Sequence, residues 1–385
     1  MALASVPATE LARYRAEFPV FERQIYLNSC SLGALSRRSR ARVATFLDEW
    51  DARGAPAWYD VWWERLAELR RRYGALIGAG PDEIALHASV STATAVLAGL
   101  LDYSRRPKVV TTDLDFPTVA YQWLAKRGAG IEVEVVRSPD GVTVPPDLLA
   151  RAVDDRTALV ATSHVFFTTG AIQDLRAVAD AAHAHGALCF VDAYQGVGQV
   201  PLDVRASGVD FLCAGGLKWL LGGPGITFLY ARRDLIARFT PTVTGWFAHA
   251  SQFEFDPGRI VWHDDARRFE QGTPALAAVH AQLGGLDVIE EIGVPTIRAA
   301  TSGLTEDLVA RATDRGFRPR VAPVADERSA IVMLPSADPH ADVAALAARR
   351  IVADARPGHV RLSPYFYNVV EDHVAALETL RPTRE

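Results

Sequence analysis

The middle of the chain alternates short apolar runs with stretches of helical periodicity. Because apolar residues recur there every three or four positions, helices are predicted at 118–127, 146–153 and 174–185. Strands that alternate with helices indicate a mainly parallel sheet with helices on both faces, and such strands are buried on both sides. The apolar runs that predict these strands lie at 109–112, 131–136, 158–163, 187–191, 211–214 and 226–230.

The two ends of the chain have a different pattern. Helices are predicted at 39–50 and 59–77 before the sheet, and the second ends at Gly78. After Thr273 the pattern predicts helices at 275–291, 295–315, 340–350 and 372–380, a strand at 330–334, and short strands near Ile351 and Val360. We therefore expect an α/β chain in three parts: an N-terminal segment that joins the small domain (1–35), a large domain (36–272) and a smaller α/β C-terminal domain (273–385).

Composition narrows the class of protein. The chain has 385 residues, of which 49% are hydrophobic and 23% charged, so it is too apolar to be disordered. A net charge of -5 gives no electrostatic footprint for nucleic acid. The first 18 residues lack the pattern of a signal peptide, and the longest apolar stretches, such as 93–101, are shorter than the roughly 20 residues that span a bilayer. The sequence predicts a cytoplasmic protein with neither a nucleic-acid nor a membrane partner.

The cysteines give no metal or disulfide pattern. Cys30, Cys189 and Cys213 are far apart, and none pairs with a second Cys or a His at zinc-ligand spacing. His183 and His185 are two residues apart on a predicted helix, so their side chains face different ways. We therefore expect buried thiols in a reducing compartment and no metal.

Lysine is rare in this chain. Among 41 Lys and Arg residues only Lys108, Lys126 and Lys218 are lysines. An arginine stays protonated, whereas a lysine amine can lose its proton and attack a carbonyl. Lys108 and Lys126 stand beside arginines, as surface lysines do, but Lys218 is enclosed by glycine and apolar residues in GGLKWLLGG. Desolvation there lowers a lysine pKa, which makes Lys218 a candidate nucleophile.

Other candidate side chains follow the predicted strands. Ligands of parallel sheets bind beyond the carboxyl ends of the strands, where Asp192, Gln195 and Phe116 stand. Ser91 and Thr92 lie at the start of an early helix, where hydroxyls and free N–H groups suit a phosphate. Taken singly, the carboxylate and the hydroxyls are also typical of turns and helix caps.

Together with Lys218 these side chains match the needs of pyridoxal phosphate. The lysine forms the imine, the Asp192 carboxylate keeps the pyridine nitrogen protonated, the Phe116 ring covers one face, and Gln195 reaches the 3′-oxygen. A nucleotide-binding P-loop is excluded because GxxxxGK[ST] does not occur. His164 follows a strand and could lie near the cofactor. His249 and His263 could line a substrate pocket or pack in the core.

Longer stretches resemble a known family. Asp192-Ala-Tyr-Gln195, followed by GVDFLCAGGLKWLLGGPGITFLY, is similar to the class V aminotransferase group of fold-type I pyridoxal-phosphate enzymes. The resemblance covers most of the chain. Within the group, several stretches resemble kynureninase: YLNSCSLGAL, WYDVWW, DFPT, SHVFFTTG, TGWFAH, QGTP and the C-terminal RLSPYFYN.

The resemblance implies roles for single residues. Lys218 would be the imine lysine and later move protons, Asp192 would pair with the pyridinium, and Phe116 would stack on the ring. Ser91 and Thr92 would hold the phosphate. In the family the site lies at a homodimer interface, so Trp246 and Thr273 could reach the partner's phosphate. Arg361 would grip the substrate α-carboxylate through a bidentate pair.

The chain departs from kynureninases at several positions. Leu217 and Val119 stand where they have a tyrosine and an aspartate, and Cys30 replaces an asparagine. Their Asp-Leu-Ala-His becomes Asp192-Ala-Tyr-Gln195, which more closely resembles cysteine desulfurases and epimerase-like members of the family. A persulfide-forming desulfurase is not expected, because no cysteine follows Cys213. We expect an enzyme that cleaves a bond at Cβ of an α-amino acid, as a lyase or hydrolase does. The alternatives are transamination, epimerisation, decarboxylation, a sugar aminotransferase, and a non-catalytic regulatory module that binds the cofactor.

Overall fold

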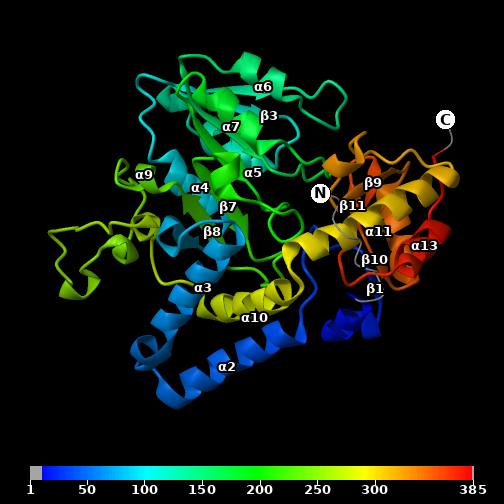
Figure 1. Cartoon of the computed structure of the whole chain (residues 1–385), viewed down its shortest axis with the longest axis horizontal. Coiled ribbons are helices and arrows are strands. Elements are labelled where there is room, and N and C mark those ends of the chain that lie inside the picture. The colour runs from blue at the N-terminus through cyan, green and yellow to red at the C-terminus, as the bar shows by residue number, and fades with distance from the viewer. Residues whose placement is uncertain (1–10, 384–385) are drawn as a thin grey trace.

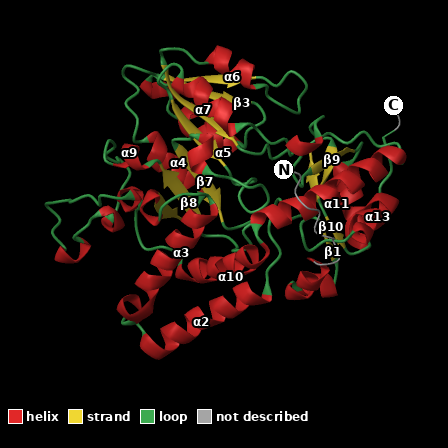
Figure 2. Cartoon of the chain, in the orientation of Figure 1, coloured by secondary structure: helices red, strands yellow, loops and turns green. Residues whose placement is uncertain are grey.

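A seven-stranded sheet forms the centre of the larger part of the protein, in a computed structural model that describes residues 11–383 (Figures 1 and 2). Only β8 runs antiparallel to its neighbours, so the predicted mainly parallel sheet is confirmed. In sheet order the strands are β2 (Ile84–His87), β8 (Thr227–Ala231), β7 (Phe211–Gly215), β6 (Leu188–Asp192), β5 (Thr157–Ser163), β3 (Lys108–Thr112) and β4 (Glu132–Val136).

Helices cover both faces of this sheet. Alternate strand residues point to opposite faces, so Val109 and Val110 enter two separate cores. The core that holds Val109 packs against α4 (Val90–Ala98) and α5 (Pro117–Leu124). The core that holds Val110 packs against helices on the other face: α3 (Trp63–Leu76), α6 (Pro146–Ala152), α7 (Leu175–His183) and α10 (Leu276–Ile292).

A smaller unit lies beside the large one, on the right in Figure 1, and contains the C-terminal part of the chain. Residues 25–26 (β1, Ile25–Tyr26) pair in parallel with β10, so part of the N-terminal segment belongs to this unit. The domain boundaries at 35 and 272 stay a prediction. The unit contains α11 (Val294–Asp314), β9 (Val332–Pro335), α12 (Pro339–Ala348), β10 (Ile351–Val352), β11 (Asp354–Arg356), β12 (His359–Leu362) and α13 (Val370–Thr379).

Two local features differ from the predicted elements. The direction of β8 follows from its connection, because the glycine-rich loop 216–226 contains no crossover helix to return the chain for parallel pairing. The helix predicted at 59–77 is α3 preceded by a π-helical turn, η3 (Trp58–Trp62). Short elements complete the chain: α8 (Val204–Ser207), α9 (Arg233–Ile236) and the 3-10 helices η1 (Ala12–Glu17), η2 (Pro19–Glu22), η4 (Pro81–Glu83), η5 (Arg127–Ala129), η6 (Trp246–Ala248), η7 (Gln252–Glu254), η8 (Ala266–Phe269) and η9 (Ala325–Glu327).

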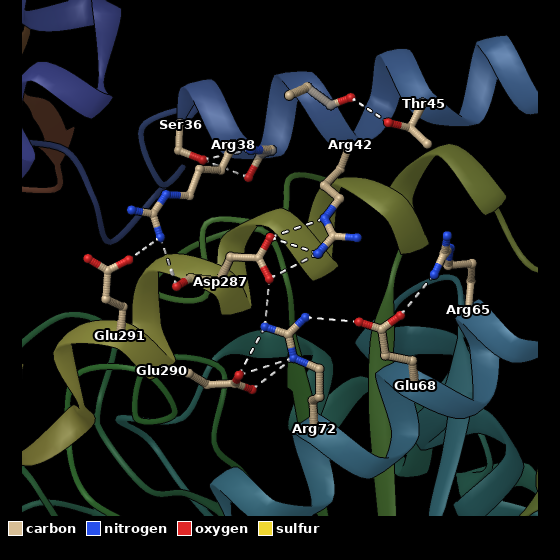
Figure 3. A network of polar contacts seen from close by, with 12 residues as sticks. Ser36, Arg38, Arg42, Thr45, Arg65, Glu68, Arg72, Asp287, Glu290 and Glu291 are labelled. Carbon is tan, nitrogen blue, oxygen red and sulfur yellow. Dashed lines mark hydrogen bonds and ion pairs between the residues drawn. The ribbon is translucent and has the colours of Figure 1, made fainter.

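An ion-pair network joins α10 to α2 (Arg37–Arg53) and α3 (Figure 3). Asp287 of α10 accepts hydrogen bonds from Arg42 of α2, at 3.1 and 3.2 Å, and from Arg72 of α3, at 2.9 Å. Arg72 also pairs with Glu290, at 3.0 Å. Such networks restrict how helices slide past one another, although each exposed pair adds little stability. The C-terminal part of α10 is therefore tied to both α2 and α3.

Three further observations concern the surroundings of the fold. Every helix within residues 11–383 is too short or too polar to cross a bilayer. The same residues contain no group of three or more His, Cys, Asp or Glu that could hold a metal ion. The three cysteines are buried and unpaired. The first ten residues of the predicted N-terminal segment, and most of the stretch compared with a signal peptide, lie outside the described residues.

Candidate active site

Lys218 lies in a tightly held loop directly after β7. The loop closes on itself, because the Gly222 N–H donates to the Gly216 carbonyl at 2.8 Å. Leu221 takes a left-handed conformation, with φ of 60°, which costs a non-glycine residue roughly 1 kcal/mol or more. Four loop carbonyls accept hydrogen bonds from outside the loop: Leu217 from the Gly33 N–H, Trp219 from the Tyr365 hydroxyl, Leu220 from the Gln282 amide and Leu221 from the Ser39 hydroxyl.

Close packing explains one glycine opposite this loop. A Cβ on Gly33 would lie 2.1 Å from the Lys218 carbonyl oxygen, so only glycine lets the N-terminal segment approach so closely. The N-terminal segment, α2, α10 and the C-terminal unit therefore all hold the backbone of the loop on either side of Lys218. This arrangement leaves the Lys218 side chain free to point away from the loop.

Asp192 ends β6, the strand next to β7. It faces Cys213 in the register of the two strands, and its Oδ1 accepts the Tyr194 N–H at 2.9 Å. Burial raises the pKa of Asp192 to about 6, although the positive charge of Lys218 works in the opposite direction. Burial likewise lowers the pKa of Lys218 to about 8. The charge of each group affects the pKa of the other, and both pKa values lie near neutral pH.

Lys218 and Asp192 line the same cavity of about 260 Å³. Among the residues predicted from the sequence, Ser91, Phe116 and Gln195 line it as well. The cavity walls also contain Leu217, which was already named from the sequence, and residues that sequence reasoning did not single out: Val90, Thr118, Ser163, Val165, Phe167 and Tyr194. Several of these could have been found, because Thr118 belongs to DFPT and Tyr194 lies between Asp192 and Gln195.

Aromatic rings surround the lysine amine. The Lys218 Nζ lies 4.7 Å from the centroid of the Tyr194 ring and 6.0 Å from that of Phe116. The Tyr194 ring packs on Gly215, where an added Cβ would lie 2.1 Å from it. The Phe116 ring meets Phe167 edge-on, with centroids 5.1 Å apart, and keeps 44% of its surface exposed. Phe116 is thus available to cover a planar ring at the cavity mouth.

The N-terminus of α4 faces the cavity with the hydroxyl of Ser91, which shares a hydrogen bond of 3.3 Å with the hydroxyl of Thr118. Ser89 caps the helix by accepting the Thr92 N–H, and the Thr92 hydroxyl donates back to the Ser89 carbonyl at 2.7 Å. The side chain of Thr92 is thus used in the cap and does not line the cavity, whereas Ser91 does. The phosphate contacts of both residues stay predictions, and the helix end favours an anion here.

Gln195 lines the cavity with an amide that already has partners. Its Nε2 donates to the Cys30 carbonyl at 3.0 Å, and its Oε1 accepts from the Trp219 indole at 2.8 Å. One N–H of the amide remains for the predicted contact with a 3′-oxygen. The Trp219 bond also ties Gln195 to the lysine loop.

Asp115 is a buried carboxylate that the sequence analysis missed. It precedes Phe116, and its charge adds to the rise in the pKa of Asp192. Burial raises the pKa of Asp115 itself, while its hydrogen bonds work against the rise. It accepts five hydrogen bonds from the ends of β3 and β5: from the Thr111, Thr112 and Thr162 hydroxyls and from the Thr112 and Ser163 backbone N–H groups. Asp115 thereby fixes the edge of the cavity.

Trp246 and Thr273 do not line the cavity that contains Lys218. They line a second pocket of about 200 Å³, bordered by the π-helical turn η3 and by further aromatic side chains. Trp246 is 44% exposed. Their predicted contact with a partner's phosphate stays a prediction.

Arg361 lies on β12 and is fully buried. Its Nη1 donates to the carbonyl of Phe167, a residue of the cavity wall, at 2.7 Å. Its charge contributes to the lowered pKa of Lys218, after the larger effect of burial. The guanidinium therefore lies behind the cavity wall, within electrostatic reach of the lysine.

The histidines named from the sequence have separate environments. His164 is buried, its Nδ1 has no partner, and burial lowers its pKa to about 4, so it is neutral. His249 bonds to the backbone of Val261. His183 and His185 bond to different carboxylates, Asp210 and Asp155.

The groups around the cavity fit pyridoxal phosphate. An amine with a lowered pKa, a carboxylate on the neighbouring strand, a helix N-terminus and an exposed aromatic ring meet in one space. Lys218 would attach the aldehyde, Asp192 would face the ring nitrogen, and the N-terminus of α4 would face the phosphate.

The lowered pKa of Lys218 predicts how fast the cofactor attaches. Only the unprotonated amine attacks an aldehyde, so the rate of attachment is expected to rise with pH and level off above about 8. An amine with the usual pKa of 10.5 would give a rate that still rises at pH 9 to about 10. Stopped-flow absorbance of protein freed of cofactor and mixed with pyridoxal phosphate measures the profile. A rate that does not level off below about pH 9.5 would show that Lys218 is not desolvated.

Comparisons with known proteins find similar proteins along nearly the whole chain. The family model for class-V aminotransferases matches residues 46–378. A Bacillus subtilis (strain 168) protein described as an uncharacterized aminotransferase is 33% identical over 377 residues, which cover 96% of each chain. A Bacillus anthracis kynureninase is 30% identical over 94% of this chain and 89% of its own. In structure, a lysine-to-alanine mutant of C-DES, with glycine covalently linked to its PLP cofactor, matches with a TM-score of 0.87 at 21% identity, over 94% of this chain and 98% of that one.

Proposed function

The chain belongs to the class-V aminotransferase family, and we propose that it is a pyridoxal-phosphate enzyme that acts on an α-amino acid through Lys218 and cleaves a bond at Cβ. Membership of the family makes it an enzyme with this cofactor and leaves the idea of a non-catalytic module without support. The observation that carries the proposal is the shared cavity of Lys218 and Asp192. The fold-type I architecture is confirmed by the similar solved structures.

Two side chains supply the chemistry of the protein itself. Bound pyridoxal phosphate provides a protonated ring that withdraws electrons from the Cα of the substrate. The Asp192 carboxylate would keep the ring nitrogen protonated. Because it is buried and accepts a hydrogen bond from the Tyr194 N–H, few other groups compete with the ring nitrogen for its negative charge. Lys218 would hold the aldehyde of the cofactor, and its amine, whose pKa burial lowers to about 8, can accept and return a proton.

Cleavage at Cβ is favoured by the kynureninase relatives. The Bacillus anthracis kynureninase aligns over 94% of the chain. The stretches 163–170 and 115–118, which resemble kynureninase in sequence, contain residues of the cavity wall. Transamination is the second candidate, because the relative described as an aminotransferase shares 33% identity. The two reactions differ in whether a bond at Cβ of the substrate breaks or the carbon skeleton stays intact and loses its α-amino group to the cofactor.

The protein is further proposed to work as a homodimer in the cytoplasm. The exposed aromatic pocket that contains Trp246 and Thr273 supports a subunit interface, with these residues directed to the partner's cofactor. Three buried, unpaired cysteines are typical of a reducing compartment.

A panel of amino acids tests the reaction. Cβ cleavage is expected to give alanine or pyruvate from the substrate backbone, whereas transamination gives the oxo-acid of the intact substrate. Mass spectrometry of the products after incubation with the holoenzyme separates the two outcomes. Formation of an oxo-acid without any cleaved product would exclude the Cβ reaction.

The same panel tests Arg361 as the group that binds the carboxylate. Replacing Arg361 by leucine is expected to raise KM for the best substrate by roughly two orders of magnitude, because a bidentate charged pair is lost. Cofactor binding, followed by absorbance, should stay unchanged. An unchanged KM would place the substrate carboxylate elsewhere.

A further inference from the structure

The edges of the Arg361 guanidinium that could bind a carboxylate already take part in internal hydrogen bonds. A guanidinium has two edges that present a pair of N–H groups, Nε with Nη2 and Nη1 with Nη2, so Nη2 belongs to both. In this structure Nη2 already donates to the Ser31 hydroxyl at 2.8 Å and to Asp354 Oδ2 at 2.5 Å. Nη1 donates to the Phe167 carbonyl, while Nε is buried without a partner. A substrate carboxylate can bind in a bidentate manner only where Asp354 or Ser31 gives up its hydrogen bond to Nη2, and of these two groups Asp354 is the one that carries a charge.

Asp354 also forms an ion pair with a second arginine, Arg356. Its Oδ1 accepts from Arg356 Nη1 at 2.7 Å, and its Oδ2 also accepts from Ser31 at 2.6 Å. Burial alone would raise the pKa of Asp354, but the hydrogen bond from Ser31 and the charges of the two arginines hold it below its usual value. The carboxylate is therefore ionised and shared between Arg361, which is fully buried, and Arg356, whose side chain is 29% exposed.

A short hairpin builds this shared arrangement. Asp354 of β11 lies directly opposite Arg361 of β12, and Arg356 lies opposite His359. The turn between them is Pro357-Gly358, and Gly358 has φ of 71°, which suits the third residue of a type II turn. The register of the hairpin thus sets the acid against the buried arginine.

The net charge of Arg361, Arg356 and Asp354 would be balanced by one bound anion. Two arginines and one aspartate carry a net charge of one, and the charges of both arginines reach Lys218, where they add to the effect of burial on its pKa. An α-amino acid has a single α-carboxylate that balances this charge. Asp354 is itself a carboxylate, held where that group would bind.

We propose that Asp354 forms an ion pair with Arg361 in the free enzyme and that a substrate carboxylate displaces it from Arg361. Asp354 then stays paired with Arg356. This inference rests on the proposed function, in which Arg361 binds the substrate carboxylate. Exchange of one carboxylate for another avoids leaving the buried guanidinium unpaired at any stage, which would be costly. The exchange also weakens the binding of every external carboxylate, because the ion pair between Asp354 and Arg361 must be broken. Asp354 and Arg356 are positioning residues for Arg361.

Binding of an unreactive carboxylate tests the exchange. The probe is 3-phenylpropionate, titrated into the holoenzyme by calorimetry, with 3-phenylpropionamide as its uncharged counterpart. Asp354→Asn is expected to bind the carboxylate about three- to tenfold more tightly, because the internal competitor loses its charge. Arg356→Gln is expected to bind it more weakly by about the same factor, because Asp354 then pairs with Arg361 alone. Binding of the amide should not change.

The double variant separates exchange from simple support of the fold. Once Asp354 is neutral, Arg356 has no carboxylate to draw away from Arg361, so Arg356→Gln is expected to weaken binding less in the Asp354→Asn background than in the wild type. Weaker binding by Asp354→Asn, or no change in Arg356→Gln, would overturn the exchange. Arg356 lies at the end of β11, beside the hairpin turn. The variant Arg356→Gln therefore still tests the exchange where Asp354→Asn does not fold. Arg349→Gln, an exposed arginine that bonds to Thr379, is the matched control.

Failure of the proposed function would look different. If 3-phenylpropionate fails to bind the wild type at tens of millimolar, or binds Arg361→Leu equally well, then Arg361 does not hold the carboxylate and the inference falls with it. If Arg361→Leu abolishes binding while Asp354→Asn weakens it, the carboxylate site stands and only the exchange is wrong.

Discussion

Replacing Lys218 by alanine is expected to lower kcat/KM by a factor on the order of 10³ or more. Lys218 is the only lysine in the cavity, and it both attaches the cofactor and moves the proton that the reaction requires. Alanine removes both actions, while the loop keeps its backbone bonds because they come from carbonyl groups. Turnover of the best substrate measures the loss, and cofactor titration should still show non-covalent binding.

Lys126→Ala is the matched control for this variant. Lys126 lies after α5, away from the cavity walls, and its loss should leave turnover unchanged. Full activity of Lys218→Ala with the control also active would exclude the lysine from the mechanism. Exogenous amines that restore part of the activity of Lys218→Ala would strengthen the assignment, because they replace the missing proton acceptor.

Asp192→Asn is expected to lower kcat by a factor on the order of 10² to 10³. An amide carries no negative charge, so it does not hold a proton on the ring nitrogen, and electrons leaving the substrate Cα find a poorer acceptor. Asn can still accept the Tyr194 N–H, so the strand end should keep its geometry. Steady-state kinetics at saturating cofactor measures the loss. Asp192→Glu, which keeps the charge, should retain more activity than Asp192→Asn.

The same variant is expected to be more stable without cofactor. The pKa of Asp192 is raised to about 6 from 3.8, so the folded state binds the proton more tightly than the unfolded chain does. Stability of the wild type therefore falls as pH rises from about 4 to 6, and the loss stays at neutral pH. Asn removes this penalty and should raise the free energy of unfolding by up to about 3 kcal/mol at pH 7.5. Lower stability at this pH would show that Asp192 is not desolvated as described.

Much of the fold and part of the site follow from the sequence, because both depend on local patterns. Buried parallel strands read as short apolar runs, and the residue after each run lies at one edge of the sheet. Asp192 and Lys218 follow neighbouring strands, β6 and β7, so the sequence alone brings them together. The scarcity of lysine then made Lys218 conspicuous.

Other features depend on contacts between distant segments. The strand β8 was predicted without its antiparallel direction, because its apolar run looks like that of a parallel strand, and the short β2 was not predicted at all. Asp115 accepts hydrogen bonds from two strand ends that are far apart in sequence. The pairing of Asp354 with Arg361 follows from the Pro357-Gly358 turn, a signal that was present in the sequence but was not used.

The measurement that tests the central claim most directly is chemical trapping of the cofactor on the native holoenzyme. Borohydride reduction followed by proteolysis and mass spectrometry is expected to find the phosphopyridoxyl group on the peptide that contains Lys218. The peptides of Lys108 and Lys126 should be unmodified, since Lys108 is held in ion pairs with Glu134 and Asp154. A label on either of those lysines, or no label at all on a protein that carries the cofactor absorbance, would contradict the account.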